Sequence, residues 1–390
     1  MRRGFPCSII QIIMYYLQAF CRSQKIWMVE ATTVTTTGSS IVVRRHSPTA
    51  FVSSSSTANS HTPFYLAKKN PSYLRRQQAL FSTNLDQLYN ADLLTSTSSG
   101  TVKRFVMLNK KASERRKAGE VIVEGPRMVL DLLKNPATHT LMKQILLSTD
   151  VDENIQQELH QILKDTASHD NLSIQMATPQ VIKACSDTVT PQGIVARVQL
   201  PTWSMDSMAS SPQQQPKQAP LYLILDGVSD PGNVGTLLRS SVAVGVQAVL
   251  LLPGSCDVWN PKAIRSAMVG SFLVPTLSVG SWSEARDMLR ECKVGRVFAA
   301  TMLEDQQTGQ VLSAAHYDID WNSEPSALII GSEGTGLSQE IRQSLHSDSD
   351  SSSNSIRAVH VPMEGTIESL NAAICGSVIL FEYMRQWKQQ

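Results

Sequence analysis

Residues 221–239 read LYLILDGVSDPGNVGTLLR and pass from an apolar run through a glycine-rich turn into a second apolar pattern. A short apolar run without polar alternation is typical of a strand that a parallel sheet buries on both faces. After the turn, Val234, Leu237 and Leu238 recur at the spacing of a helix. A strand that leads through a turn into a helix is the repeating unit of α/β proteins. This stretch therefore predicts an α/β domain built on a parallel sheet.

The same alternation continues over residues 221–390, which we interpret as one α/β domain. Residues 346–355 read HSDSDSSSNS and predict a disordered polar insertion within it. The apolar patterns predict strands at 221–225, 248–252, 297–300, 327–330 and 358–361, and helices at 234–244, 261–269, 282–290, 338–345 and 369–387.

A smaller α/β domain is expected over residues 102–200. Its predicted strands lie at 121–124, 144–147 and 194–198, and helical patterns follow the first two. Residues 201–220 read PTWSMDSMASSPQQQPKQAP, and this enrichment in Pro, Gln and Ser predicts a linker between the two domains.

Residues 1–85 carry ten basic residues against one acidic residue, Glu30, and are rich in Ser and Thr. This composition is typical of an organelle targeting segment without a core of its own. The stretch YLRRQQALFST at 73–83 resembles a mitochondrial processing region, whereas the apolar run from Ile9 to Leu17 is typical of a secretory or bipartite plastid signal. We expect an organellar protein, with the mitochondrion favoured over the plastid; a misplaced start codon is the alternative explanation for the first residues.

Composition excludes several classes of protein. With 42% hydrophobic and 17% charged residues, the chain is neither collagen-like, nor a coiled coil, nor wholly disordered. The longest apolar run, from Gly4 to Cys21, is broken by Gln11 and Gln18, which argues against a polytopic membrane protein. The six cysteines form no C-x-x-C pair, and no His, Cys or carboxylate cluster has ligand spacing, so neither a disulfide framework nor a metal site is expected.

Charge is distributed unevenly. Residues 86–390 hold 25 basic and 32 acidic residues, so a nucleic acid would have to be met by a local basic patch. The densest cluster in the chain contains Lys110, Lys111, Arg115 and Arg116, and we predict that it contacts RNA.

Three glycine-rich or polar loops follow predicted strands, at the edge where open parallel sheets bind ligands. They are DGVSDPGNVG at 226–235, GSEGTG at 331–336 and PMEGTIESLN at 362–371. Asn233 and Ser369 are candidate N-caps of the helices that follow the first and third loops. Each loop alone is weak evidence for function, because capped turns are common in purely structural settings.

In their order and spacing, LDGVSDPGNVGTLLRS, IIGSEGTGLS and VPMEGTIESLNAA resemble the three motifs of the SpoU branch of the knotted RNA ribose methyltransferases. The intervening WNPKAIRSAMVGSFLVP resembles that family as well, and VIVEGPRMVLDLL is loosely similar to its ribosomal-protein-like substrate-binding domain. The resemblance implies that the C-terminal segment forms a trefoil knot, although generic topology rules would not suggest one.

The resemblance further implies S-adenosylmethionine as the cofactor, bound in the knot. By position, the backbones at Gly331, Val361 and Leu370 would contact it, Ile330 and Pro362 would wall its pocket, and Thr301 would lie beside it.

The implied reaction is methyl transfer to a ribose 2′-hydroxyl of RNA. The residues that match the family's catalytic positions are Arg239, Asn233, Glu333, Ser369 and Asn371. The family assigns activation of the hydroxyl to the position of Arg239, but a guanidinium stays protonated in proteins. Holding the phosphate beside the target ribose is physically the easier task for Arg239.

Lys262 and Arg265 match a Lys-x-x-Arg helix of the family and are predicted RNA contacts. A homodimer is expected, because family members are homodimers. The predicted last helix is apolar at Ile374, Val378, Phe381 and Met384, which fits either a dimer interface or a face of the core, and the interface is favoured. Large-subunit ribosomal RNA is the favoured substrate. A transfer-RNA ribose methyltransferase and a catalytically silent assembly factor remain as alternatives.

Overall fold

The computed structural model of this chain describes residues 36–37, 40–41, 89–165, 172–209, 219–304, 311–347, 356–364 and 369–389. The chain divides into two compact units, residues 1–70 and 71–390. In the first unit, β1 (Thr36–Thr37) pairs antiparallel with β2 (Ser40–Ile41). The remainder of the predicted targeting segment at 1–85 lies outside the described residues.

A five-stranded mixed sheet opens the second unit, in the order β3-β6-β5-β7-β4. Strands β4, β5 and β7 are the three that apolar patterning predicts, whereas β3 and β6 are not predicted. Strand β3 extends the smaller domain upstream of its predicted boundary at residue 102. It was not predicted because Asn90 and Asp92 interrupt its apolar pattern. The bounds are β3 (Tyr89–Leu94), β4 (Glu120–Glu124), β5 (Met142–Ser148), β6 (Ser173–Ala177) and β7 (Ile194–Gln199).

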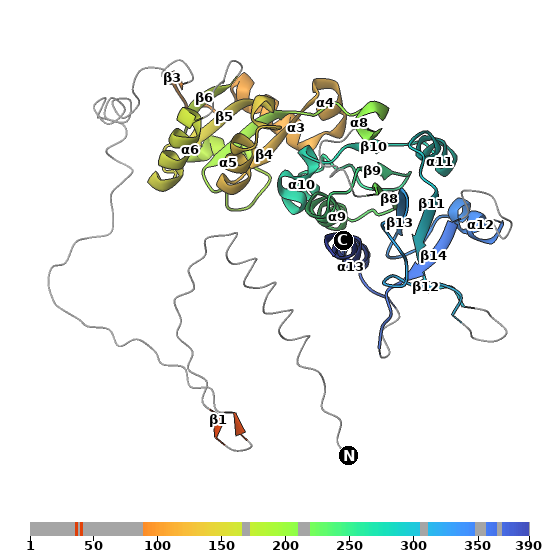
Figure 1. Cartoon of the computed structure of the whole chain (residues 1–390). Helices are drawn as coiled ribbons and strands as arrows, with labels where there is room; N and C mark the ends of the chain where they lie inside the picture. Colours follow the sequence, from red (N-terminus) through yellow and green to blue (C-terminus); the bar gives the residue numbers. More distant parts are fainter. Residues whose placement is uncertain are drawn as a thin grey trace. The chain divides into compact units, whose positions relative to one another are not determined.

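Helices cover both faces of this smaller sheet (Figure 1). On one face, α5 (Pro126–Lys134) and α6 (Glu153–Asp165) bury Leu132 and Leu159 against the sheet. On the other face, α3 (Gly100–Lys110) and α7 (Pro179–Cys185) supply a separate cluster around Phe105. The short α4 (Ala112–Ala118) follows α3, and the 3-10 turn η1 (His139–Leu141) precedes β5.

A seven-stranded sheet forms the second domain, and all its strand pairs are parallel, as predicted. Its order is β10-β9-β8-β13-β11-β14-β12. The five predicted strands are present; the edge strands β10 and β12 are too short for a pattern to reveal. The bounds are β8 (Leu221–Asp226), β9 (Ala248–Leu251), β10 (Thr276–Ser278), β11 (Arg296–Ala300), β12 (Ala314–Ala315), β13 (Ser326–Gly331) and β14 (Ile356–His360).

The side chains of β8 alternate between two cores, which confirms that this strand is buried on both faces. Leu223 belongs to the core under α9 (Pro231–Val244) and α13 (Ala372–Lys388). Tyr222 and Ile224 belong to the opposite core, under α11 (Trp282–Glu291) and α12 (Gln339–Ser347). Figure 1 shows α13 beside α9, and a hydrogen bond of 2.8 Å joins Ser240 on α9 to Ser377 on α13.

The connection from β11 to β13 contacts both β14 and α13 before the chain returns to the sheet. It passes beyond β14, where β12 pairs with β14 at Ala314 and Val359. It then returns over α13, where Trp321 N donates to Gln386 Oε1 (2.9 Å) and Gln386 Nε2 donates to Ile319 O (2.8 Å). Strand β13 finally pairs with β11 on the side away from β14. A connection that crosses β14 and packs on α13 in this order is the one that the predicted trefoil knot requires.

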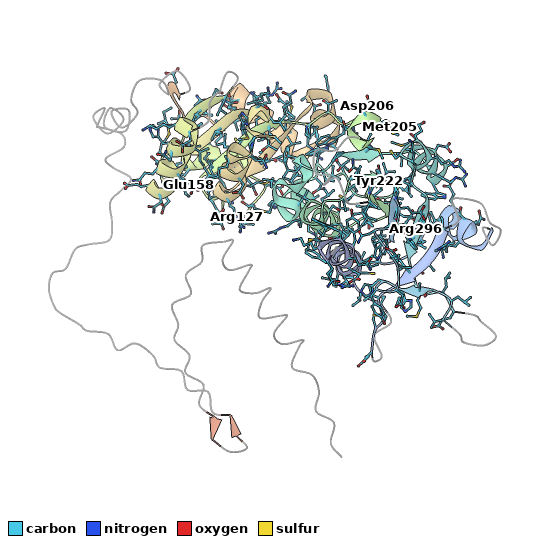
Figure 2. All side chains as sticks on the ribbon, in the orientation of Figure 1. Arg127, Glu158, Met205, Asp206, Tyr222 and Arg296 are labelled. Carbon is cyan, nitrogen blue, oxygen red and sulfur yellow. The ribbon has the colours of Figure 1, made fainter. Side chains whose placement is uncertain are left out.

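Two predicted irregular segments are partly helical. Within the predicted linker at 201–220, α8 (Met205–Ala209) carries Met205 and Asp206, as Figure 2 shows, and buries Met208 in the core under α11. Gln247 Nε2 donates to Met208 O over 2.7 Å. The first part of the linker is therefore packed onto the second domain, and 210–218 lie outside the described residues. Helix α12 ends two residues into the predicted insertion, whose remainder, 348–355, is likewise outside them.

The two domains share one hydrophobic cluster. Ile264 of α10 (Pro261–Ala267) and Phe272 of the 3-10 segment η2 (Met268–Phe272) are buried with Val121 and Leu132 of the smaller domain. The same α10 touches α9 backbone to backbone, since a Cβ on Gly235 would lie 2.3 Å from Ala263 O. The segment α10–η2 thus packs between the smaller domain and α9.

Candidate active site

The three loops singled out in the sequence follow β8, β13 and β14, at the carboxyl ends of three parallel strands. Parallel strands point their carboxyl ends to the same edge of a sheet, which is where such sheets bind ligands. The structure brings the loops together there through side chains on each of them.

In the first loop, Asp230 rather than Asn233 caps α9, which corrects the sequence prediction. Its Oδ1 accepts a hydrogen bond from Asn233 N at 3.0 Å. Its Oδ2 pairs with Lys262 Nζ at 2.9 Å. The hydrogen bond from Lys262 and the backbone bond from Asn233 lower the pKa of Asp230. The predicted cap was wrong because Asp and Asn are both strong N-caps, three residues apart here.

Four residues earlier, Asp226 ends β8 with 3% of its surface exposed. Burial raises the pKa of this carboxyl, although Ser338 N opposes the shift by donating to Oδ2 over 2.6 Å. This bond ties the start of the first loop to Ser338, two residues beyond the second loop.

The second loop is a tight hairpin. Ser332 and Gly336 exchange backbone hydrogen bonds of 3.0 and 2.9 Å, and Gly336 has φ of +67°, a conformation that favours glycine. A Cβ on Gly331 would lie 2.8 Å from the carbonyl carbon of Gly336. The loop therefore requires glycine at both positions to fold back directly after β13.

In the third loop, Asn371 caps α13, again in place of the predicted residue, Ser369. Asn371 Oδ1 accepts from Ala373 N at 3.0 Å and from Ile374 N at 3.2 Å. Ser369 lies two residues upstream, exposed, and its backbone is not helical. The helix therefore begins three residues later than predicted.

Glu333 joins the three loops. Its Oε1 accepts hydrogen bonds from Asn233 Nδ2 (2.5 Å), from Asn371 Nδ2, and from Ala372 N (3.1 Å). Asn371 Nδ2 also donates to Asn233 Oδ1 at 3.1 Å. One carboxylate thus fixes the start of α9 against the start of α13, with the second loop between them. Hydrogen bonds to a charged acceptor are stronger than those between neutral groups.

A cavity of about 300 Å³ opens beside this network. Its size is at the lower end of small-molecule sites. Glu333 and Ser369 line it, as do five of the six residues predicted to contact a cofactor: Thr301, Ile330, Gly331, Val361 and Leu370. Pro362, the sixth, lies between two lining residues without lining the cavity itself.

The character of the cavity fits the cofactor that the resemblance implies. Ile330 and Leu337, both at most 4% exposed, give it apolar walls suited to a planar adenine. The edges of β13 and β14 offer backbone donors and acceptors, and Glu333 and Ser369 add polar groups. Sequence reasoning missed Met302, His360 and Cys375 in the lining. Only His360 carried a signal that could have revealed it, because it lies two residues before the third loop.

Arg239 lies outside the Glu333 network. Six residues along a helix rotate a side chain by about 120° and advance it by about 9 Å, so Arg239 and Asn233 leave α9 in different directions. Arg239 is exposed, does not line the cavity, and makes no hydrogen bond or ion pair with the residues that the structure describes. Its backbone is held by η2, since a Cβ on Gly270 would lie 3.3 Å from Arg239 Cα. The guanidinium is thus free to bind an anion while its helix is fixed.

The residues predicted to contact RNA fall into two groups. Lys110, Lys111 and Arg116 are exposed and form no ion pair within the described ranges. Arg115 is 5% exposed; it donates to Leu108 O at 3.1 Å and pairs with Asp257 Oδ2 at 3.0 Å. The structure therefore gives Arg115 a role in joining the two domains, which its place in a basic cluster did not suggest.

The remaining two predicted RNA contacts are also paired. Lys262 binds Asp230, as described above, but its side chain remains 57% exposed. Arg265 Nη1 pairs with Asp187 Oδ2 at 2.9 Å and lies 3.4 Å from Glu124 Oε1, both in the smaller domain. Arg265 thus forms a second ionic contact between the domains.

Two kinds of feature are absent from the parts of the chain that the structure describes. No group of three or more His, Cys, Asp or Glu residues there could hold a metal ion. No helix there is long and apolar enough to cross a membrane.

Known proteins resemble this chain over both domains. The SpoU rRNA Methylase family matches residues 220–381, and the MRM3-like substrate binding domain matches residues 100–196. The mouse protein named rRNA methyltransferase 3, mitochondrial, is 30% identical over 306 residues, covering 70% of this chain and 69% of its own length. The Bacillus subtilis 23S rRNA (guanosine(2553)-2′-O)-methyltransferase RlmP is 27% identical over 288 residues, covering 74% and 97%.

Among solved structures, the SpoU methyltransferase AviRb from Streptomyces viridochromogenes, in complex with AdoMet, has the same fold. Its TM-score is 0.57 at 24% identity, covering 74% of this chain and 98% of that one. An rRNA methyltransferase from Sinorhizobium meliloti gives a TM-score of 0.58 at 23% identity, covering 76% and 98%.

Proposed function

Because this chain belongs to the SpoU family of rRNA methylases, we propose that it transfers a methyl group from S-adenosylmethionine to a ribose 2′-hydroxyl of mitochondrial large-subunit ribosomal RNA. The observation that carries the proposal is the Glu333 network, which joins three loops beside a cavity of about 300 Å³.

The cofactor would be held by the cavity beside Glu333. Gly331, Val361 and Leu370 would contact it through their backbones, and Ile330 would pack against it. When bound, S-adenosylmethionine supplies an electrophilic methyl group on its sulfonium. Glu333, Asn233 and Asn371 keep the three loops at a fixed separation, so the cavity is shaped before any ligand enters.

Arg239 would hold the phosphate next to the target ribose. A planar guanidinium can contact two oxygens of a phosphate at once, which fixes the orientation of the nucleotide. Such positioning accelerates a reaction because the reacting atoms no longer have to find one another. The lack of a protein partner for Arg239 among the described residues, together with its fixed backbone, supports this role.

The smaller domain would bind the RNA through Lys110, Lys111, Arg116 and the adjacent Lys117, which are all exposed. Structured RNA is recognised largely through shape, phosphates and 2′-hydroxyls, for which an exposed basic helix end is suited. Because the domain is packed onto α10, RNA bound there would be held in a fixed relation to α9.

The protein would act as a homodimer through α13. Ile374 and Phe381 are 53% and 44% exposed on this helix, and Val378 between them is 36% exposed. Three apolar side chains at helical spacing form a face that a second copy can bury. Ser377 joins this helix to Ser240, the neighbour of Arg239, so the interface would lie beside the proposed phosphate site.

The mitochondrion is proposed as the compartment because rRNA methyltransferase 3 of mouse, human and Xenopus is named as mitochondrial. The proposal is tested by mapping 2′-O-methyl groups on organellar ribosomal RNA in cells with and without the protein. Loss of one site from the mitochondrial large-subunit RNA is expected. Loss of a site in a transfer RNA or a plastid RNA would instead identify a different substrate, and an unchanged map would contradict the enzymatic assignment.

A further inference from the structure

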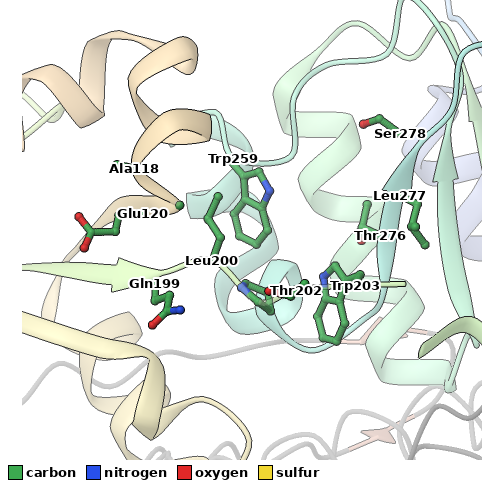
Figure 3. A pocket seen from close by; sticks show the side chains of 12 residues that line it. Ala118, Glu120, Gln199, Leu200, Thr202, Trp203, Trp259, Thr276, Leu277 and Ser278 are labelled. Carbon is green, nitrogen blue, oxygen red and sulfur yellow. The ribbon is translucent and has the colours of Figure 1, made fainter. Parts of the chain in front are cut away.

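A second, larger cavity of about 670 Å³ lies between the smaller domain and an edge of the parallel sheet (Figure 3). The smaller domain contributes residues 118–120 and Gln199, and the chain that leaves β7 contributes 200–203. The second domain contributes Trp259 and strand β10. None of the residues of the Glu333 network lines it, so this cavity is separate from the cofactor site.

Two tryptophans stand among the polar and small residues that line this cavity, and the lining carries little net charge. Trp203 and Trp259 both line it, with Leu200 and Leu277 beside them (Figure 3). Its one carboxylate, Glu120, is already paired with Arg104 at 2.7 Å and Arg197 at 2.5 Å. Among the described residues, no free cation lines the cavity that would attract a phosphate into it.

The two sides of the cavity are locked together. Arg115, on the helix that leads to residues 118–120, forms its buried ion pair with Asp257, whose Oδ1 accepts from Trp259 N at 3.0 Å. The ring of Trp259 also packs edge-on against Phe272, with centroids 5.2 Å apart. The cavity is therefore formed in advance and does not depend on a ligand to bring its walls together.

Exposed cations border the cavity on the side of α4. Arg116 and Lys117 directly precede Ala118 and Gly119, which line it. Both are exposed and have no ion pair within the described residues. A cavity with two tryptophans in its lining and cations beside it matches a nucleotide, whose base is planar and uncharged and whose phosphate is anionic.

We propose that this cavity receives an unpaired base of the RNA substrate, stacked on Trp203 and Trp259, while Arg116 and Lys117 bind the adjoining phosphates. The inference rests on the proposed action on RNA. Proteins that read single-stranded RNA stack its bases on aromatic side chains, and each stacked base contributes about 1–3 kcal/mol. A duplex cannot offer a base in this way, so the cavity would select loops or bulges.

The test uses the full-length protein without S-adenosylmethionine, with oligo(A), oligo(U) and the duplex that they form as probes. Tryptophan fluorescence is read during titration. We expect a single strand to quench the fluorescence and to bind more tightly than the duplex. The quenching should be smaller in Trp203→Phe but unchanged in Trp282→Phe, a matched control at the first residue of α11, where the tryptophan is 2% exposed.

Two further variants test the cavity itself. Trp203→Ala should weaken single-strand binding by about 5- to 150-fold, which corresponds to the removal of one stacked base. Ser278→Trp should have a similar effect by filling the cavity from the exposed β10 residue, without removing any packing. Single-strand affinity that is unchanged in both variants would overturn the proposal, as would a duplex that binds and quenches equally. Unchanged single-strand affinity in both variants is also the result expected if the cavity binds a protein partner instead of RNA.

This experiment separates the two proposals, because binding and quenching are measured without methyl transfer. A protein that binds single strands through Trp203 but never methylates RNA would contradict the proposed function alone. A protein that still methylates RNA and binds it with undiminished affinity after both substitutions would contradict only the proposal that the cavity receives a base.

Discussion

The loop cluster around Glu333 and the basic cluster of α3 and α4 both stand out in the sequence, yet they are built in opposite ways. Around Glu333, polar side chains bind one another, and the exposed Arg239 stands apart from them. In the basic cluster the side chains point outward, and Arg115 is the exception, because it is buried and paired across the domain boundary. Two arginines that look alike in the sequence therefore have different tasks: Arg239 is available to a ligand, whereas Arg115 holds the protein together.

Removing Arg239 should have the largest effect. We expect Arg239→Ala to lower single-turnover methyl transfer by at least about 100-fold, since the reacting nucleotide is no longer held in position. Cofactor affinity measured by calorimetry should stay close to that of the wild type, because Arg239 does not line the cofactor cavity. Arg239→Lys keeps the charge without the planar fork, so its rate of methyl transfer should lie between those of the wild type and of Arg239→Ala. Full turnover in Arg239→Ala would show that Arg239 does not hold the substrate, and its contrast with Arg115 would then be wrong.

The basic cluster should respond to substitution in two different ways. Replacing Lys110, Lys111 and Arg116 with Gln should weaken RNA binding and lower the log–log salt slope by about 0.7–0.9 for each phosphate that is no longer neutralised. Arg115→Met should leave that slope unchanged but lower the free energy of unfolding by about 1–3 kcal/mol, because Asp257 is left without its partner. Urea unfolding and RNA titration at several salt concentrations measure both. If Arg115→Met alters the slope as much as one of the lysines does, Arg115 contacts RNA after all.

Arg265 gives a smaller and sharper test, because two roles compete for it. As an ionic link between the domains, it should show a coupling energy of about 0.5–1 kcal/mol with Asp187 in a double-mutant cycle of Arg265→Ala and Asp187→Ala. The salt dependence of RNA binding should not change. The matched control is Arg290→Ala with Asp287→Ala, an exposed pair within α11. A lowered salt slope with no coupling would favour the original expectation that Arg265 binds RNA.

The smallest effects should come from two carboxylates of the first loop, Asp226 and Asp230, whose contributions to stability should change with pH in opposite directions. Burial raises the folded-state pKa of Asp226, so wild type should lose stability relative to Asp226→Asn as pH rises from the ordinary aspartate range through that raised pKa. The hydrogen bond from Lys262 lowers the pKa of Asp230, so its contribution is present above the ordinary range and is lost as pH falls through the lowered pKa. Urea unfolding of both Asn variants between about pH 3 and 8 would show these slopes; slopes of the same sign would contradict the assignment.

Much of the fold could be predicted because apolar runs such as 221–225 are long enough to identify a buried strand. The strands of the two α/β domains that were not predicted lack such a run: β12 has two residues, β10 has three, β3 contains Asn90 and Asp92, and Gln175 interrupts β6. Their pairing depends on the neighbouring strand, which a local pattern does not contain.

The candidate site divides in the same way. Motif order pointed to Glu333, Asn233 and Asn371, and the structure places them in one network. Local reasoning could not choose between Ser369 and Asn371 as the cap of α13, because both residue types accept hydrogen bonds from a helix start. It also could not reveal the partner of Arg115, which lies 142 residues away along the chain.

The connection between β11 and β13 has a consequence for how the protein is made. The cofactor cavity takes walls from Thr301, from Gly331 and from Leu370, and Leu370 precedes α13, on which the β11–β13 connection packs. A ribosome releases the first two well before the third, so a nascent chain can complete most of its parallel sheet while it still lacks a binding site. Ligand binding can then appear only after the segment that carries Leu370 has folded onto the sheet. The rate at which newly made chains acquire cofactor affinity would measure that folding step directly, independently of the collapse that precedes it.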